Sequence, residues 1–418
     1  MRSFLNRLKI RLIIFLAVLG PGVITAVADN DAGGVATYTV AASMYGMASQ
    51  FLKIPETIIL AATQEIGARI AIVAKKGLGD LIRERYGVKL SLLIFILYFI
   101  TNQGVVLQNV SGLKASFELF GVNWQFFLIA TCIFLIFFVI FFNYKKLQRI
   151  FLLMIIFYFG YIFSAFLAKP NWADAVKESL IWPSKINIFD LTFWFSRVAV
   201  LGTTITAWGQ FFVHSYIIDK KLDVNHLKYE RLEVYLGALI TNFFSWMMAV
   251  AVTYTLFAHG IKVDDGFKAA LAIKPFAGEM AFIFFAFGLF GASLLGLTIV
   301  PLATAYVFSE IFGYKGSLDS SFTKGKLFYG FFIFQILVGL IIALFPQTSL
   351  FKLTLYVDFL NGAMLPIIFY FLIKFSEDPR IMGKYTSSGL SKIIVRSAAV
   401  IISFMVIISF IGKIFRII

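Results

Sequence analysis

Apolar segments long enough to cross a lipid bilayer recur along the whole chain. A transmembrane helix needs about 20 predominantly apolar residues, and the sequence contains eleven candidates by that criterion. They lie near residues 11–45, 49–74, 88–116, 124–143, 149–169, 191–218, 232–258, 277–311, 327–346, 350–374 and 393–412. Only 14% of the residues are charged, whereas roughly a quarter are charged in a soluble globular domain. We therefore expect an all-α integral membrane protein with about 11 transmembrane helices.

Basic residues cluster in the short connections between these segments. They precede the first segment and follow the second, fourth, sixth, eighth and tenth, and the formal net charge is +15. Loops rich in lysine and arginine stay on the cytoplasmic side of a membrane. The pattern predicts a cytoplasmic N-terminus and, with an odd number of spans, an external C-terminus, in the inner or plasma membrane. Topology accounts for the charge, so we expect the lipid bilayer as the main partner and no nucleic acid.

The connections are too short to separate soluble domains. The longest lie at 170–190 and 375–391, so residues 1–418 are expected to form one membrane domain that functions as a monomer. The single cysteine, Cys132, lies in an apolar run, which excludes an intrachain disulfide and a thiolate metal site. Paired acid and base groups or a metal cluster would indicate an enzyme. The sequence lacks them, and we expect neither an enzyme nor a bound cofactor.

The first and sixth segments each carry a signal that breaks a helix. Residues 29–34 read "DNDAGG" and residues 202–210 read "GTTITAWGQ", and glycine costs about 1 kcal/mol in a helix. Interrupted segments at corresponding positions are a sequence sign of an inverted-repeat transporter with a binding site near mid-membrane. The implied repeats cover about 11–169 and 191–374, followed by an extra helix at about 393–412.

Asp31 lies about twenty residues from the start of the first span, near mid-bilayer at 1.5 Å per residue. A carboxylate at that depth costs roughly 2.5–3.5 kcal/mol, so we expect it to bind a cation in a polar cavity. A structural alternative is that Asp31, Asp29 or Asn30 caps the second half-helix. With few histidines and no thiolate, oxygen ligands favour Mg²⁺, Ca²⁺ or Mn²⁺.

Three other charged residues inside apolar segments, Asp358, Glu65 and Arg69, bear on the prediction. Asp358 is expected either to lie along the ion path or to form an interhelical hydrogen bond, for which Asn361 is the candidate partner. Glu65 and Arg69 are spaced i,i+4, which lets opposite charges pair on one helix face. We expect a structural ion pair near the cytoplasmic end.

At these residues the chain resembles the Nramp family of divalent metal transporters. The stretch "GPGVITAVADNDAGG" at 20–34 is similar to the first-helix signature of that family, with residues 31–34 on its Asp-Pro-Gly-Asn motif. Further similar stretches lie at 67–87, 288–313 and 360–383, so the resemblance covers the whole chain. It implies two inverted five-helix repeats of the amino acid–polyamine–cation (LeuT-like) architecture, working by alternating access. It also implies that the Asp31 carboxylate and the Ala28 carbonyl bind the ion.

The chain departs from the family at several ligand positions. Gly34 replaces the asparagine ligand and leaves space. The Met-Pro-His motif of the sixth helix corresponds to Thr206-Ala207-Trp208 or to Ala207-Trp208-Gly209, so the thioether is lost, although the carbonyl of Thr204 or Thr203 remains available.

The proton-path and tenth-helix positions depart as well. Val106 and Asn109 stand where the family has two acids that move protons, and Asp358 replaces a glutamine. His214 and Asp358 are the remaining candidates for proton carriers. Losing the sulfur ligand removes discrimination against Mg²⁺, and Mg²⁺ usually keeps several waters.

These departures resemble those of the Nramp-related magnesium transporters. We expect transport of Mg²⁺, with Mn²⁺ possible, and weak or no coupling to protons. The site candidates are Asp31, Ala28, Gly34, Thr204, Thr206, Ala207 and Asp358. A proton-coupled Mn²⁺ or Fe²⁺ transporter, an organic solute or cation symporter of the same fold, and a non-transporting sensor remain as alternatives.

Overall fold

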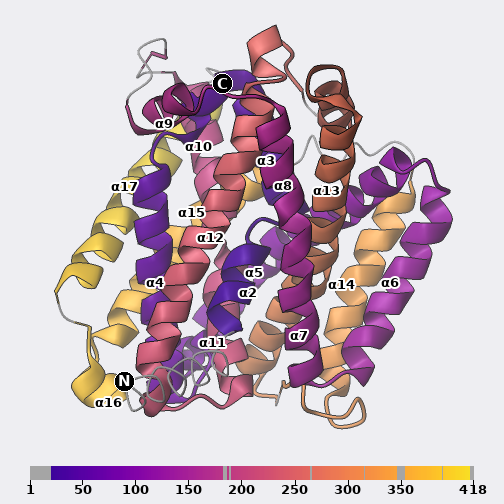
Figure 1. Ribbon diagram of the computed structural model, residues 1–418. Helices are drawn as coiled ribbons and strands as arrows, with labels where there is room; N and C mark the ends of the chain where they lie inside the picture. Colours follow the sequence, from indigo (N-terminus) through magenta and orange to yellow (C-terminus); the bar gives the residue numbers. More distant parts are fainter. Residues whose placement is uncertain are drawn as a thin grey trace, which may run out of the picture.

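The computed structural model describes residues 20–414 except 182–185, 188–189, 264–265, 315, 346–353 and 388. Within these residues the chain is helical (Figure 1). The first half contains α2 (Pro21–Ala28), α3 (Ala32–Tyr45), η1 (Gly46–Gln50), α4 (Lys53–Ala74), α5 (Leu78–Leu119), α6 (Trp124–Phe141), α7 (Tyr144–Met154), η2 (Ile155–Tyr158), α8 (Phe159–Leu167) and α9 (Trp172–Leu180). The second half contains α10 (Leu191–Thr204), α11 (Ala207–Lys220), η3 (Val224–His226), α12 (Leu227–Thr253), η4 (Phe257–His259), α13 (Gly266–Phe312), α14 (Lys326–Leu344), α15 (Thr354–Ser376), α16 (Pro379–Met382), η6 (Gly383–Tyr385) and α17 (Leu390–Ile414).

Nine of the described helical stretches are long and apolar enough to cross a membrane. They coincide with nine of the eleven expected segments. The other two expected segments appear as the pairs α2/α3 and α10/α11. Helix α2 has only 8 residues, and α3, α10 and α11 have 14 each. The expected start of the first segment, 11–19, lies outside the described residues.

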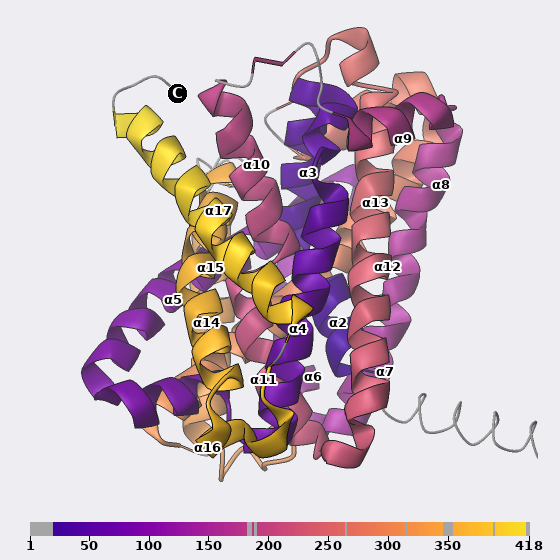
Figure 2. The same cartoon turned by 90° about the vertical axis from the view of Figure 1, so that its left-hand side faces the viewer.

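The two broken pairs lie at the centre of the bundle. In Figure 1, α2 and α11 occupy its lower half and α3 and α10 its upper half, while α17 lies on one flank and α6 and α14 on the other. From the side, α17 runs beside α10 and α15 (Figure 2). We call the end that carries α16 the lower end and the end that carries α9 the upper end.

Glycine makes a sharp corner near the start of both α5 and α13. Gly87 has φ 82° and ψ 171°, and Gly278 has φ 86° and ψ 174°. Residues with a side chain rarely adopt such positive φ angles. A short helical stretch therefore precedes the long one at the lower end in α5 and at the upper end in α13. The connections at 170–190 and 375–391 contain short helices, α9 and α16.

A buried ion network connects helices toward the upper end. Arg197 of α10 and Glu56 of α4 form an ion pair, and each side chain is only 1% exposed. Arg197 also donates to the carbonyl of Ser49 in η1. Lys53 lies 3.3 Å from Glu56 and donates to Ser245 Oγ of α12 at 3.2 Å. The network thereby ties α10 to α4, α12 and the segment that follows α3.

Candidate functional site

The break in the first span covers the three residues between Ala28 and Ala32. Asp31 is the N-cap of α3, because its Oδ1 accepts a hydrogen bond from Gly34 N at 3.1 Å. An Asp at this position satisfies one of the N–H groups that lack an intrahelical partner. The capping alternative is therefore correct for Asp31 but not for Asp29 or Asn30: Asn30 instead donates to the Thr241 carbonyl of α12 at 2.8 Å. Asp31 is thus both the cap of α3 and the acid expected at mid-membrane.

Asn109 of α5 forms hydrogen bonds with the last residue of the break and with the first residue of α3. Its Nδ2 donates to Asp31 Oδ2 at 2.7 Å, and its Oδ1 accepts from Ala32 N at 3.1 Å. A neutral amide therefore directly holds the carboxylate at a position where the family resemblance places an acid. Val106, one turn earlier, is a fully buried apolar side chain.

The break in the sixth span lies against the break in the first. Thr206 is the N-cap of α11, and its hydroxyl donates to Asp29 Oδ1 at 2.6 Å. The Thr204 hydroxyl, at the end of α10, lies 2.8 Å from the Tyr38 hydroxyl of α3. The structure therefore brings Asp31, Ala28, Gly34, Thr204, Thr206 and Ala207, all expected at the site, to one crossing of four half-helices.

Asp358 of α15 reaches the same region from a third direction. Its Oδ2 accepts from Thr37 Oγ1 at 2.5 Å and its Oδ1 from Gln108 Nε2 at 3.3 Å. Asn361, the partner proposed from the sequence, instead accepts from Ala207 N at 3.4 Å. Gln108 directly precedes Asn109, so consecutive residues of α5 contact the two acids.

The space expected at Gly34 is absent. A Cβ atom on Gly34 would lie 2.9 Å from the Asp29 carbonyl oxygen and 3.0 Å from Thr203 Oγ1, and both distances are too short for a relaxed contact. Gly34 allows α3 to pack closely against Asp29 and α10, and the expectation of an open position there was wrong.

His214 lies away from the acids, on α11. It is seven residues beyond Ala207, which is about 10 Å along a helix. Its Nδ1 is 2.9 Å from the Gln210 carbonyl, and a Cβ on Gly67 of α4 would lie 2.9 Å from its ring. The structure gives it a packed position between α11 and α4.

The donors at the crossing are oxygen atoms. The described residues contain no group of three or more His, Cys, Asp or Glu side chains able to hold a metal ion together. Backbone carbonyls supplement the acids, since α2 and α10 end at the crossing and the last carbonyls of a helix lack intrahelical donors. Their C-terminal ends also carry partial negative charge. Such an arrangement attracts a hard cation.

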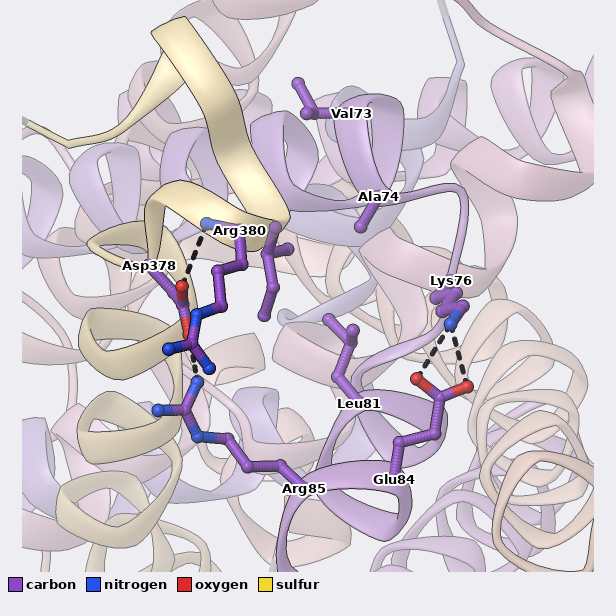
Figure 3. A pocket seen from close by; sticks show the side chains of 9 residues that line it. Val73, Ala74, Lys76, Leu81, Glu84, Arg85, Asp378 and Arg380 are labelled. Carbon is purple, nitrogen blue, oxygen red and sulfur yellow. Dashed lines mark hydrogen bonds and ion pairs between the residues drawn. The ribbon is translucent and has the colours of Figure 1, made fainter.

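The lower end carries a separate pocket of about 520 Å³ between α4, the start of α5 and α16 (Figure 3). Its acids already have basic partners: Lys76 lies 2.7 Å from Glu84, and Arg85 pairs with Asp378. The N–H of Arg380 and the Arg85 guanidinium hold the pKa of Asp378 below its usual value. With its negative charge neutralised, this pocket is a poor candidate for a cation site.

Glu65 and Arg69 form the expected pair, at 3.1 Å. Glu65 also lies 2.9 Å from Arg231 of α12. Arg69 in turn donates to the Tyr385 carbonyl and to Ser387 Oγ, both at 2.7 Å. The structural interpretation of this pair is confirmed, and it extends to the connection that follows α15.

Comparisons with known proteins agree with this architecture. The family described as natural resistance-associated macrophage protein-like (Nramp) matches residues 22–412. A divalent metal cation transporter MntH of Chromohalobacter salexigens is 24% identical over 67% of this chain and 65% of its own length. Another, from Latilactobacillus sakei, is 21% identical over 49% of this chain and 45% of its own length, so the chain spans less than two thirds of both. A metal transporter nramp1 homolog of Dictyostelium discoideum is 24% identical over 92% of this chain and 73% of its own length.

Solved structures show the same fold. A crystal structure of an Eremococcus coleocola manganese transporter mutant has a TM-score of 0.73 at 16% identity, covering 96% of this chain and 88% of that one. Mhp1, a nucleobase-cation-symport-1 family transporter, has a TM-score of 0.62 at 12% identity over 94% and 93% of the chains. MhsT in complex with L-phenylalanine has a TM-score of 0.61 at 16% identity over 96% and 98%. The LeuT-like fold expected from the sequence is confirmed.

Proposed function

The chain belongs to the Nramp family, and from that premise we propose that it moves divalent metal cations across a cell membrane by alternating access. Mg²⁺ is the proposed physiological ion and Mn²⁺ a second substrate. The lower end faces the cytoplasm in this proposal, because basic connections favour that side.

One observation carries the proposal. Asp29, Asp31 and Asp358 are 1%, 3% and 1% exposed, and none of the described basic side chains forms an ion pair with them. A buried carboxylate without a counter-ion is costly. A divalent cation at the crossing supplies the missing positive charge, and two of the acids, Asp31 and Asp358, accept hydrogen bonds from consecutive residues of α5.

The preference for Mg²⁺ rests on the donor chemistry. Oxygen ligands suit Mg²⁺ and Mn²⁺, whereas a thioether favours softer metals, and no methionine occupies the break at 205–206. Mg²⁺ keeps several waters in most protein sites. Because Gly34 is packed, we place those waters among the carboxylates and hydroxyls of the crossing.

Transport without obligatory proton coupling is part of the proposal. Val106 and Asn109 of α5 carry no titratable group, and Asn109 is occupied in bonding Asp31 and Ala32. Uptake of Mg²⁺ into liposomes should therefore continue without a pH gradient. Uptake that requires an imposed gradient would favour a proton-coupled Mn²⁺ or Fe²⁺ transporter.

Flux into proteoliposomes tests the central claim. The wild type should take up Mg²⁺ and Mn²⁺, and excess Mg²⁺ should suppress Mn²⁺ uptake. Asp31→Asn keeps a residue able to cap α3 but removes the charge, and it should abolish both fluxes. Asp190→Asn makes the same change at the N-cap of α10 and should leave flux unaltered.

Failure has a clear form. No flux of either ion in the wild type, or equal flux in the wild type and Asp31→Asn, contradicts the proposal. Calorimetric binding of an organic cation in place of metals would instead favour the symporter alternative, since three acids repel a substrate carboxylate.

A further inference from the structure

Asp29 differs from the other two buried acids in its hydrogen bonding. Both carboxylate oxygens of Asp31 and both of Asp358 accept hydrogen bonds. Asp29 accepts one bond at Oδ1, from Thr206. Its Oδ2 is buried and has no partner among the described residues. Of the six carboxylate oxygens of these acids, Asp29 Oδ2 is the one that accepts no hydrogen bond from the part of the chain that the structure describes.

The Asp29 carboxylate lies at the contact between the two breaks. A Cβ on Gly209, in the first turn of α11, would be 3.0 Å from Asp29 Oδ1. The Thr206 hydroxyl that donates to Oδ1 also accepts from Gly209 N at 3.0 Å. Asp29 therefore follows α2 in the chain while its side chain is held on α11. A change in the hydrogen bonding or charge of this carboxylate therefore affects both α2, which it follows, and α11, which it contacts.

An unused buried acceptor beside Asp31 matches the needs of a partly hydrated divalent ion. The waters that such an ion keeps point their O–H groups outward and need acceptors. A second carboxylate also balances a double positive charge that one carboxylate leaves half compensated. Hydrogen-bonded groups around a metal orient its ligands and tune its affinity.

We propose that Asp29 is a second charged residue of the ion site, whose Oδ2 accepts a hydrogen bond from a water bound to the transported cation. The inference rests on the proposed function, because it assumes that the crossing binds a divalent ion. It assigns Asp29 a role in affinity for doubly charged ions, and it makes the Asp29–Thr206 bond the link between ion binding and the two broken helices.

Calorimetric titration of purified protein with MgCl₂ tests this role. In Asp29→Asn the amide oxygen still accepts the Thr206 hydrogen bond while the charge is lost. Mg²⁺ should bind at least tenfold more weakly, about 1.4 kcal/mol, with the melting temperature of the metal-free protein unchanged. The control Asp190→Asn should bind Mg²⁺ as the wild type does.

A matched pair covers the case in which Asp29→Asn does not fold. Asp29→Glu and Asp29→Gln lengthen the side chain equally, but only the glutamate keeps the charge and both acceptor oxygens. The glutamate variant should bind Mg²⁺ at least tenfold more tightly than the glutamine variant, and equal affinities would overturn the inference. If Asp29→Asn binds as the wild type while Asp31→Asn does not bind, the inference fails and the proposed function stands. If the wild type binds neither Mg²⁺ nor Mn²⁺, the proposed function itself fails.

Discussion

Gly34 shows how tightly the crossing is packed at the scale of one residue. An added methyl group meets the Asp29 carbonyl and Thr203 Oγ1, and overpacking of this kind costs about 1–3 kcal/mol. We therefore expect Gly34→Ala to lower both the melting temperature in detergent and the Mg²⁺ flux. Gly330→Ala in α14 is the matched control, because nothing lies within 4 Å of its added Cβ. A Gly34→Ala variant as stable and active as Gly330→Ala contradicts this expectation.

Asp31 was predictable because its depth in an apolar segment already makes a carboxylate exceptional. The hydrogen-bond partners of the acids were not predictable, since Thr37 and Asp358 are 321 positions apart in the chain and Asp29 and Thr206 are 177 apart. A local sequence pattern cannot predict contacts between residues so far apart. The sequence predicts only a capping role for Asp29, although a second acid two residues from Asp31 is itself a signal of a role at the site.

At the scale of elements, the Arg197–Glu56 pair fastens α10 to α4. Breaking a buried ion pair leaves one charge uncompensated and typically costs 3–5 kcal/mol. Glu56→Gln should therefore lower the free energy of unfolding by roughly that amount. Adding Arg197→Met should restore part of the loss, because the stranded guanidinium is then gone while the Lys53 ammonium still lacks its partner.

A double-mutant cycle of unfolding free energies measures this coupling. Lys76 and Glu84, each 46% exposed, supply the comparison, and removing that pair should change stability by only about 0–1 kcal/mol. Additive effects of the Glu56 and Arg197 substitutions would show that the two residues do not depend on each other.

The sequence predicted where the two broken elements lie, because polar and glycine-rich residues interrupt apolar runs at 29–34 and 202–210. The observed breaks at 29–31 and 205–206 fall inside those stretches. The corners at Gly87 and Gly278 were not predicted, since a lone glycine near the start of an apolar segment does not reveal its φ angle. The buried network of Arg197 was missed because a single arginine inside a predicted span gives no clue to its partner.

At the scale of the whole molecule, orientation in the membrane is open to a direct test. The single cysteine, Cys132, is buried and should not react with a water-soluble maleimide. Ala173→Cys, exposed in α9 at the upper end, should be labelled on intact cells. Ser321→Cys, exposed in the connection after α13 at the lower end, should be labelled only after permeabilisation. The reverse pattern would place the lower end outside the cell.

The overall architecture was predictable because eleven apolar segments with two interruptions match few folds. The boundaries of the two repeats at 11–169 and 191–374 stay a prediction, as does action as a monomer. Length and hydropathy define the spans, but they do not show which end of each span faces the cytoplasm. The basic connections are the sequence signal for that orientation.

The three buried acids also subject the protein to the membrane potential. With all three carboxyl groups ionised, the empty crossing carries three negative charges, and a bound divalent ion reduces them to one. Each elementary charge that moves through the whole field gains or loses about 2.3 kcal/mol per 100 mV. In the proposed transport cycle, loaded and empty forms would therefore respond differently to voltage when they reorient. An interior-negative potential would oppose inward movement of the ionised, unloaded carboxylates and favour their return outward, so voltage would help to return the empty carrier.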